Sequence, residues 1–257
     1  MKYPIYIPSL GRYENMRTVK MLLNAGIDNF FIVVEKFEKF DYMLHFPVFA
    51  ESGARKILPL PMSHCGTSSI ARNFCLNHAA KNGHKKLWML DDDITRVFAH
   101  NQGKNINWGV QEIFEELEKI ADSPINKKVM AMGLRTSASF LKQVKKSEQR
   151  NCSLSSIYLL TVDNFRFRGI MLVDMDYQLQ ILRAGFETLR MENFAFSFIT
   201  PTKIKGGYYD IYTDDEKRRK AINLFLKYNP DVDPEISRNT TGFLVLKNIS
   251  KIWRKFK

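Results

Sequence analysis

Three consecutive acidic residues, Asp91, Asp92 and Asp93, form the segment of the sequence best suited to chemistry. They directly follow Leu87–Leu90, a short apolar run that predicts a buried strand. Neighbouring carboxylates repel one another, so a fold that gathers them needs a counter-charge, and Mg²⁺ or Mn²⁺ suits hard oxygen ligands. In an extended segment Asp91 and Asp93 point the same way. The triplet therefore predicts a metal site or, alternatively, a solvated acidic turn that caps a helix after Ile94.

Strand and helix signals alternate through the first ninety residues. Because alternation of this kind is typical of a parallel, right-handed α/β sheet, we expect an α/β fold with a mostly parallel central sheet flanked by helices. Ligands of such sheets bind at the carboxyl ends of the strands, where the triplet lies. The segments that carry these signals are a strand Tyr3–Ile7 stopped by Pro8, a helix Asn15–Ala25 closed by Gly26, a strand Phe30–Val34, and a helix from Thr67 or Ser68 to Gly83.

The composition excludes several classes of protein. A chain of 257 residues that is 45% hydrophobic can bury a core, which excludes a disordered chain and a small disulfide scaffold. The three cysteines, Cys65, Cys75 and Cys152, include no CxxC pair, which argues against structural zinc and favours a reducing compartment. No run approaches the roughly 18 to 20 apolar residues of a membrane span, and the first residues lack a signal-peptide core, so we expect a cytoplasmic protein.

The charge balance predicts a polyanionic partner. There are 39 Lys and Arg against 27 Asp and Glu, a formal net charge of +12. Clustered cations bind phosphate backbones through counterion release. The alternative is that the charges only make the surface soluble. Net charge does not distinguish DNA, RNA and an anionic membrane as the partner. The basic clusters are Lys142 with Lys145, Lys146 and Arg150; Lys217–Lys220; and Lys251 with Arg254, Lys255 and Lys257.

Several short motifs occur in an order that resembles GT-A nucleotide-sugar glycosyltransferases. The resemblance spans roughly residues 3 to 200 and implies that the aspartate triplet is the DxD motif of that family. The motifs are the strand Tyr3–Ile7 followed by Pro8-Ser9-Leu10-Gly11-Arg12, the strand end Val33-Val34-Glu35, Ile70-Ala71-Arg72-Asn73, Leu90-Asp91-Asp92-Asp93, and the acidic segment Asp174–Phe186.

The resemblance implies a nucleotide pocket formed by Pro8, Ser9, Arg12 and Glu35. Glu35 would accept a hydrogen bond from the base edge of uridine, so the expected donor is a UDP-sugar. The alternatives are a surface charge at Arg12 and a solvated carboxylate at Glu35.

On the same grounds Arg72 would neighbour the diphosphate. Asp91 would lie near the ribose and, with Asp93, hold a Mn²⁺ or Mg²⁺ ion that bridges the phosphates, while Asp92 would contact the nucleotide. The alternative for Arg72 is an internal salt bridge with the aspartates.

Asp174 matches the catalytic base of the family, which implies an inverting reaction, and Asp176 would fix the neighbouring loop. The alternative is that both aspartates cap the helix Tyr177–Ala184, which stabilises a helix by about 0.5 to 2 kcal/mol. All five histidines precede this segment, so the late histidine ligand of many GT-A enzymes is missing. Asp210, after the possible close-approach pair Gly206-Gly207, or water would replace it.

Compact GT-A proteins with these motifs resemble phage enzymes of the TET-associated type, which glycosylate hydroxymethylpyrimidines in DNA. The implied acceptor is 5-hydroxymethylcytosine in double-stranded DNA, with the modified base flipped out of the stack, in the cytoplasm of an infected host cell. The segment Ser137–Ser156 would be a mobile loop near the DNA with Phe140 and Leu141 as wedges, and Arg166 and Arg168 would contact phosphates or pair with acids.

We expect a single domain, 1–257, with a nucleotide-sugar-binding half (1–100), an acceptor-binding half (101–230) and a basic C-terminal extension (231–257). Asp214–Tyr228 predicts a helix, and Ile249–Lys257 is an alternative interfacial helix. Other functions stay open: transfer to a polysaccharide, lipid or protein, non-catalytic DNA binding, or a two-metal nuclease built from Asp91, Asp93, Asp174 and Asp176.

Overall fold

The structure is a computed structural model that describes ten ranges of the chain: residues 1–46, 56–61, 67–101, 104–137, 146–199, 206–207, 209–232, 235–238, 244–247 and 249–257. Cys65, the expected wedge residues Phe140 and Leu141, and two members of the first basic cluster, Lys142 and Lys145, lie outside the described residues.

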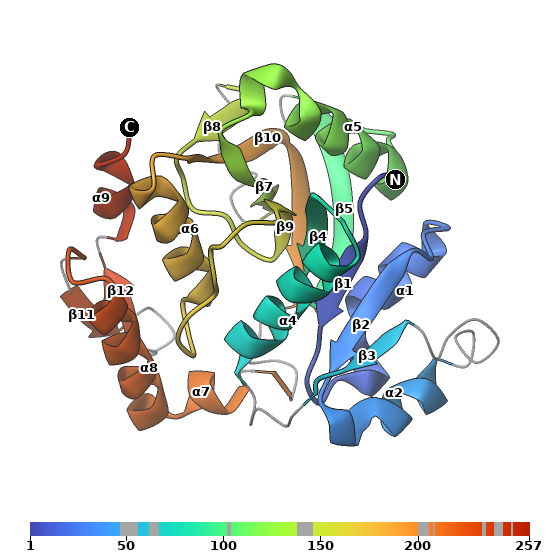
Figure 1. Ribbon diagram of the computed structural model, residues 1–257, viewed down its shortest axis with the longest axis horizontal. Coiled ribbons are helices and arrows are strands. Elements are labelled where there is room, and N and C mark those ends of the chain that lie inside the picture. Colours follow the sequence, from blue (N-terminus) through green and yellow to red (C-terminus); the bar gives the residue numbers. More distant parts are fainter. Residues whose placement is uncertain are drawn as a thin grey trace.

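A ten-stranded mixed sheet runs through the described part of the molecule, in the order β3-β2-β1-β4-β9-β7-β10-β5-β6, with β8 paired to β10 (Figure 1). The pairings give β1, β2, β3, β4, β6, β7 and β10 one direction and β5, β8 and β9 the opposite one. The expected α/β fold with a mostly parallel central sheet is therefore confirmed. The strands are β1 (Ile5–Pro8), β2 (Phe30–Val34), β3 (Ile57–Pro59), β4 (Lys86–Leu90), β5 (Ile94–Asn101), β6 (Lys104–Ile106), β7 (Val129–Thr136), β8 (Glu148–Arg150), β9 (Ile157–Thr161) and β10 (Glu187–Phe198).

The first half of the sheet is entirely parallel and follows the sequence pattern closely. Strand β1 pairs with β2 on one side and β4 on the other, and β2 pairs with β3. Strand β2 has the predicted bounds, and the predicted helices appear as α1 (Arg17–Asn24) and α4 (Ser68–Lys81). The short strand β3 and the helix α2 (Lys39–His45), preceded by the 3-10 turn η2 (Lys36–Glu38), carry signals too short to have been predicted.

The second half contains the antiparallel pairs. The residue after the aspartate triplet, Ile94, begins β5 and not a helix, so the alternative of an acidic helix cap is wrong. Strand β5 pairs antiparallel with β10, which also pairs in parallel with β7 and shifts register between Met191 and Ala195. The connecting helices are α5 (Val110–Asp122) and α6 (Val173–Arg183). Two 3-10 turns complete the described elements of the sheet region: η1 (Tyr13–Asn15) precedes α1, and η4 (Pro124–Asn126) follows α5.

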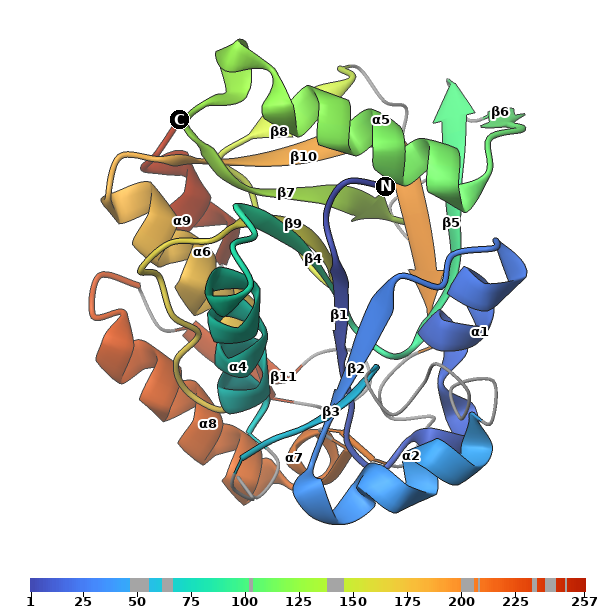
Figure 2. The ribbon, with the colours of Figure 1, turned by 45° about the vertical axis from the view of Figure 1, so that its right-hand side comes forward.

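The sheet separates two hydrophobic clusters, since alternate side chains of each strand point to opposite faces. In β1, Ile5 and Ile7 pack with residues of α1, α2 and α5, whereas Tyr6 packs with residues of α4 and α6. Figure 2 shows α5 on one side of the sheet and α4 on the other. The helices thus hold the carboxyl ends of β1, β2 and β4 at one edge.

The C-terminal segment packs on the sheet-covering helices. The predicted helix Asp214–Tyr228 appears as α8 (Asp215–Tyr228), and the Asp214 carboxylate caps it by accepting hydrogen bonds from the amides of Glu216 and Lys217. The other elements are α7 (Tyr209–Thr213), the hairpin β11 (Glu235–Arg238) and β12 (Leu244–Lys247), and α9 (Ile249–Arg254). Ile252 and Trp253 of α9 are buried in a third cluster with Leu179 of α6 and Phe225 of α8. The apolar side chains proposed for an interfacial helix therefore pack inside the protein.

None of the helices in the described ranges has both the length and the hydropathy that a membrane span requires.

Asp122, at the end of α5, ties two strands to that helix. Its carboxylate accepts hydrogen bonds from Lys2, Lys86 and the Tyr3 hydroxyl at 2.8, 2.5 and 2.7 Å. Burial raises the pKa of Asp122, but these three donors outweigh burial and lower it to about 2.

We expect Asp122→Asn to lower the free energy of unfolding at pH 7 by about 1 kcal/mol, because water screens this half-exposed group. A lowered folded-state pKa stabilises the protein above about pH 3.8, and the contribution is lost as the pH falls through about 2. Urea unfolding of both proteins at pH 7 and pH 2 measures the difference, and a difference that persists undiminished at pH 2 would contradict the expectation.

Candidate active site

The loop after β1 holds the aspartate triplet through Arg12. The Arg12 guanidinium pairs with Asp92 and, at 3.3 Å, with Asp93, and all three side chains are buried. Ser9 Oγ donates to Asp92 Oδ2 at 2.5 Å and also contacts the Tyr42 hydroxyl at 2.7 Å. Arg12 is therefore an internal counter-charge, not a surface charge, and Asp92 is engaged by the protein itself.

The backbone of the triplet is fixed by residues far away in the sequence. Thr18, fully buried in the first turn of α1, donates its hydroxyl to the Asp91 carbonyl at 2.5 Å and accepts from the Ile94 amide at 3.0 Å. The Asp91 amide donates to Ser156 O at 2.8 Å, and the Ile199 amide donates to Asp93 O at 3.1 Å. These bonds set the turn between β4 and β5 that presents Asp91 and Asp93.

A second ion pair lies on the other side of the triplet. Arg72 of α4 donates to Asp91 Oδ1 at 2.5 Å, which is the internal salt bridge considered as its alternative role. The guanidinium lies 5.6 Å from the ring centre of Tyr158 and 5.4 Å from that of Phe167, within cation–π range. Both rings therefore fix Arg72 where it faces the triplet.

Asp174 lies in the first turn of α6 on the Arg72 side of the triplet. Its Oδ2 accepts a hydrogen bond from the Tyr158 hydroxyl at 3.4 Å. Burial raises the pKa of Asp174, Arg72 lowers it and Asp91 raises it, with a net rise. A carboxylate with a raised pKa is a better proton acceptor, so the position suits a general base.

The electrostatics of Asp93 differ from those of its neighbours. Burial, Asp91 and Asp92 together raise the pKa of Asp93 to about 7, and Arg12 opposes them only in part. Asp93 Oδ1 is buried and makes no hydrogen bond within the described residues. A buried carboxylate oxygen without a partner is costly, so this atom needs a positive group.

The residues present fit a divalent metal ion held by few protein ligands. No group of three or more His, Cys, Asp or Glu residues with metal-binding geometry occurs in the ranges that the structure describes. Mg²⁺ is commonly bound by one or two carboxylates together with substrate phosphates and water. Asp93, with its unpartnered oxygen, and Asp91 meet that requirement.

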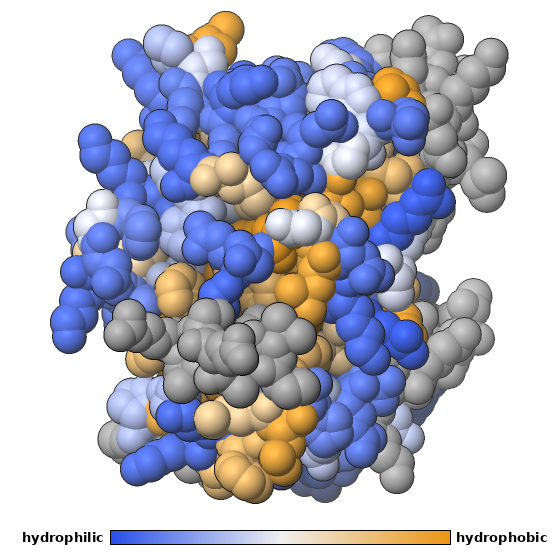
Figure 3. Space-filling view, turned by 90° about the vertical axis from the view of Figure 1, so that its right-hand side faces the viewer, coloured by the Kyte–Doolittle hydropathy of each residue, from blue (hydrophilic) through white to orange (hydrophobic). Residues whose placement is uncertain are grey.

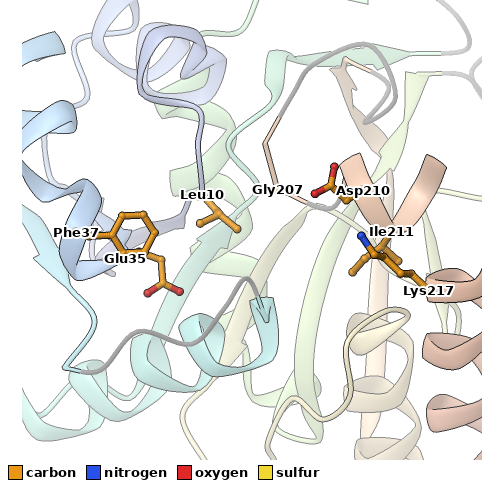
Figure 4. Close-up of a pocket in the computed structure, with 7 residues that line it drawn as sticks. All are labelled: Leu10, Glu35, Phe37, Gly207, Asp210, Ile211 and Lys217. Carbon is orange, nitrogen blue, oxygen red and sulfur yellow. The ribbon is translucent and has the colours of Figure 1, made fainter. Parts of the chain in front are cut away.

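A cavity of about 390 Å³ opens beside the loop after β1. Leu10, Glu35 and Phe37 line one side, and Asp210, Ile211 and Lys217 line the other (Figure 4). Gly207 lies between the two sides, and a Cβ built there would be 3.0 Å from Arg12 Nη2. The cavity therefore adjoins the guanidinium that pairs with Asp93.

Of the remaining predicted residues, Pro8 and Ser9 lie outside this cavity lining, whereas Asp210 belongs to it. Pro8 ends β1 opposite Val33 of β2, and the Ser9 amide continues that pairing at 2.9 Å to Val33 O. Asp210, the candidate late ligand, is exposed in α7 and lines the cavity with Glu35.

The loop before α6 uses its cations internally. Asp176, fully buried, pairs with Arg168 at 2.7 Å and accepts from Asn229 at 2.9 Å, so it holds this loop as expected. Arg166 donates to the carbonyls of Asp163 and Phe165 at 2.6 and 2.7 Å. Arg168 therefore pairs with an acid, which is one of its two expected roles, whereas Arg166 is bound by backbone carbonyls.

Five contributors carry no recognisable sequence motif. The sequence pattern around an isolated threonine or aromatic residue predicts at most that the side chain is buried. Its role in the site becomes clear only from its contacts. The residues are Thr18, Phe37, Tyr42, Tyr158 and Phe167.

Gly206 is the point at which the C-terminal segment meets the loop after β1. A Cβ at Gly206 would lie 2.6 Å from the carbonyl oxygens of both Leu10 and Gly11, and φ is +91°. The adjacent Gly207 amide donates to Leu10 O at 2.8 Å. Only glycine permits this approach.

We expect Gly206→Ala to weaken binding of UDP, the nucleotide that the sequence resemblance implies, by more than about tenfold, because the turn must move away from Arg12. Gly185→Ala is the matched control, since Gly185 has φ +80° but no atom within 4 Å of its Cβ position. Both variants should lose about 1 kcal/mol of stability from the positive φ. Calorimetric titration with UDP separates them, and equal affinities would contradict the role of the turn.

Comparisons with solved structures give distant similarities. A solved structure assigned as a nucleotide-diphospho-sugar transferase from Desulfovibrio desulfuricans has 10% identity and a TM-score of 0.46, covering 88% of this chain and 98% of its own. The mannose-1-phosphate geranyltransferase of Thermus thermophilus has 12% identity and a TM-score of 0.41, covering 76% and 75%. No curated protein matches the sequence.

The family assignment rests on the sequence. The model of the family described as TET-Associated Glycosyltransferase matches residues 3–206, a range that contains β1, the aspartate triplet and Asp174. The match covers most of the chain and ends at the turn that meets the loop after β1. The chain therefore belongs to the TET-associated glycosyltransferase family and is a glycosyltransferase with an α/β fold.

Proposed function

We propose that the protein transfers a sugar from a UDP-sugar to the hydroxymethyl group of 5-hydroxymethylcytosine in DNA, with inversion and with a divalent metal ion. The observation that carries the proposal is the arrangement around the triplet. Asp93 presents a buried carboxylate oxygen without a hydrogen-bond partner in the described residues, and Arg72 lies between Asp91 and Asp174.

The donor side consists of the cavity and the two arginines. Glu35 lines the cavity as a hydrogen-bond acceptor for the base, and Pro8 and Ser9 shape the loop on which Arg12 is held. Asp91 and Asp93 would hold Mn²⁺ or Mg²⁺, which when bound neutralises the charge that develops on the leaving diphosphate. Arg72, oriented by two rings, stabilises the same charge.

The acceptor side consists of Asp174 and its neighbours. The hydroxymethyl oxygen attacks the anomeric carbon on the face opposite the diphosphate, and a new carbon–oxygen bond forms. The bond from the anomeric carbon to the phosphate oxygen breaks, and its electron pair leaves with UDP. The hydroxyl proton passes to the Asp174 carboxylate. The Tyr158 hydroxyl, whose pKa burial keeps well above its usual value, stays protonated and orients that carboxylate.

The DNA acceptor is supported by family membership and by the net charge of +12. It implies action where DNA is present, in the cytoplasm of an infected cell if a phage encodes the protein, with the modified base flipped into the site. A two-metal nuclease has less support, because Asp176 is fully buried against Arg168 and Asn229 and does not face the triplet residues.

The test is incubation of the protein with Mn²⁺, a panel of UDP-sugars and duplex DNA that contains 5-hydroxymethylcytosine, followed by digestion and mass spectrometry of the nucleosides. We expect the mass of one sugar to be added, and neither unmodified cytosine DNA nor a reaction with EDTA should gain it. If no UDP-sugar modified the DNA but the protein transferred a sugar to a glycan, lipid or protein, the proposed DNA acceptor would be wrong. The assignment as a glycosyltransferase would still hold.

A further inference from the structure

The exposed aromatic surface beside the cavity has no role in the function proposed so far. Phe37 of η2 and Phe40 and Leu44 of α2 expose 68%, 68% and 61% of their surface. Figure 3, which views the molecule from the side of α1 and α2, shows hydrophobic surface between hydrophilic regions, including at the lower end where α2 lies in Figure 1. Of these three residues only Phe37 lines the cavity.

The opposite side of the cavity comes from a part of the chain that the family match does not include. That match ends at residue 206, whereas Gly207, Asp210, Ile211 and Lys217 follow it. This second side is anchored to the first, because the Gly207 amide donates to Leu10 O at 2.8 Å and the Tyr209 amide donates to Gly206 O at 3.2 Å. The cavity is therefore built by a defined contact between two segments.

The lining combines four kinds of chemistry. Phe37 supplies a flat apolar face, Leu10 and Ile211 supply aliphatic surface, Glu35 supplies an acceptor, and Lys217 supplies a cation. In Figure 4 the Lys217 ammonium group is directed toward Asp210 and the opposite side of the cavity. Its nearest acidic partner, Asp214, is 4.0 Å away, and the Lys217 side chain is 57% exposed.

A planar ring with N–H donors and a linked anionic group matches that combination. The volume of about 390 Å³ lies in the range of about 300 to 1,000 Å³ that small-molecule sites occupy. The position also fits, because Gly207 abuts Arg12, and Arg12 pairs with Asp93 where the diphosphate would be held. The loop after β1 therefore connects the cavity, which would hold the base, with the triplet, which would hold the diphosphate.

We propose that the nucleobase of the donor stacks on Phe37, and that Gly207, Asp210, Ile211 and Lys217 form the second side of its site, with Lys217 attracting the diphosphate. This inference rests on the proposed UDP-sugar donor and assigns its base and phosphate contacts to residues outside the expected nucleotide motifs. It makes the segment beyond the family match part of the donor site.

The stacking contact is tested with Phe37→Ala, with Phe40→Ala as the matched control of equal exposure. Loss of one base–aromatic stack should weaken binding by about tenfold or more. We expect that loss for UDP and for UMP with Phe37→Ala and no change with Phe40→Ala. Phe37→Trp should retain binding, and UDP should quench the fluorescence of the new indole. Equal UDP affinity of wild type and Phe37→Ala, or loss only with Phe40→Ala, would overturn the proposal.

The cation is tested with Lys217→Ala against Lys220→Ala, one turn further along α8. Lys220 pairs with Glu216 at 2.6 Å and does not line the cavity. We expect Lys217→Ala to weaken the binding of UDP by about three- to tenfold and to leave the binding of uridine almost unchanged. The variant should also reduce the salt dependence of UDP binding. Equal losses for UDP and uridine would assign Lys217 a purely structural role and overturn its contact with phosphate.

The wild-type titration separates this proposal from the function on which it rests. Wild-type protein that binds no UDP, with or without Mn²⁺, would contradict the UDP-sugar donor itself. Wild-type protein that binds UDP with unchanged affinity in Phe37→Ala would leave the donor in place and overturn only the site assigned here.

Discussion

Asp93→Asn should lower kcat by about 100- to 1,000-fold while leaving the protein at least as stable as wild type. Asparagine keeps the shape of the side chain but removes the charge that the metal ion and the leaving diphosphate require, and removal of one electrostatic stabiliser commonly costs that much in rate. The effect on stability has the opposite sign. Burial, Asp91 and Asp92 raise the pKa of Asp93 by more than Arg12 lowers it. The ionised carboxylate therefore destabilises the folded state, and the neutral amide of asparagine does not.

Two measurements on purified protein check this pair of outcomes. Transfer assays over a range of Mn²⁺ concentrations should show the loss of kcat, and thermal unfolding should show a midpoint equal to or above that of wild type. Mn²⁺ with UDP should raise the midpoint of wild type but not that of Asp93→Asn. Asp28→Asn, at an 83% exposed side chain, is the surface control and should change neither property. A variant that keeps wild-type activity would remove Asp93 from the metal site.

The stability–activity conflict at Asp93 explains why the triplet needs so many internal partners. Arg12 pairs with Asp92 and Asp93, and Arg72 pairs with Asp91. Thr18 holds the backbone of the triplet through a hydrogen bond to the Asp91 carbonyl. Breaking a buried ion pair is costly because it leaves an uncompensated charge. Arginine pairing therefore keeps the acidic edge folded in the absence of a ligand, and a donor with its metal ion would add the positive charge that Asp93 Oδ1 lacks.

Local signals were sufficient for the elements that carry the site. The β-branched run Phe30–Val34 is a strand with the predicted bounds, the triplet lies at the carboxyl end of β4, and Asp214 caps α8. In each case the signal lies within the element itself, in its periodicity, its cap or its apolar run.

The contacts that complete the site were beyond sequence reasoning because they join distant positions. Thr18 binds Asp91 across 73 residues, and Arg12 binds Asp92 across 80. The sequence resemblance implies a nucleotide-binding role for Arg12, but its pairing with the aspartates depends on the parallel arrangement of β1 and β4. Tyr158 and Phe167 have no signal at all, since an aromatic residue in an apolar stretch predicts only burial. The Gly206-Gly207 pair did indicate a close approach, but nothing in the sequence shows that Ile211 and Lys217 line the cavity, because they reach it only through packing.

Asp174→Asn should lower kcat by about 100- to 10,000-fold with little change in UDP affinity. A general base contributes about that range, and asparagine cannot accept the acceptor proton. The neighbouring carboxylate provides a matched control, since Asp176 lies in the same turn of α6 but binds Arg168, Gln180 and Asn229 inside the protein.

Asp176→Asn should therefore destabilise the fold by about 2 kcal/mol, because it removes the charge that binds the partly exposed Arg168 guanidinium. Its kcat per folded molecule should fall far less than that of Asp174→Asn. Single-turnover transfer, UDP titration and urea unfolding of both variants separate the two roles. If Asp174→Asn lost stability but kept its single-turnover rate, Asp174 would be a helix-start residue like Asp176, and the proton would have to leave through another group. The contact of Asp174 with the Tyr158 hydroxyl and its position near Arg72 and Asp91 favour the base.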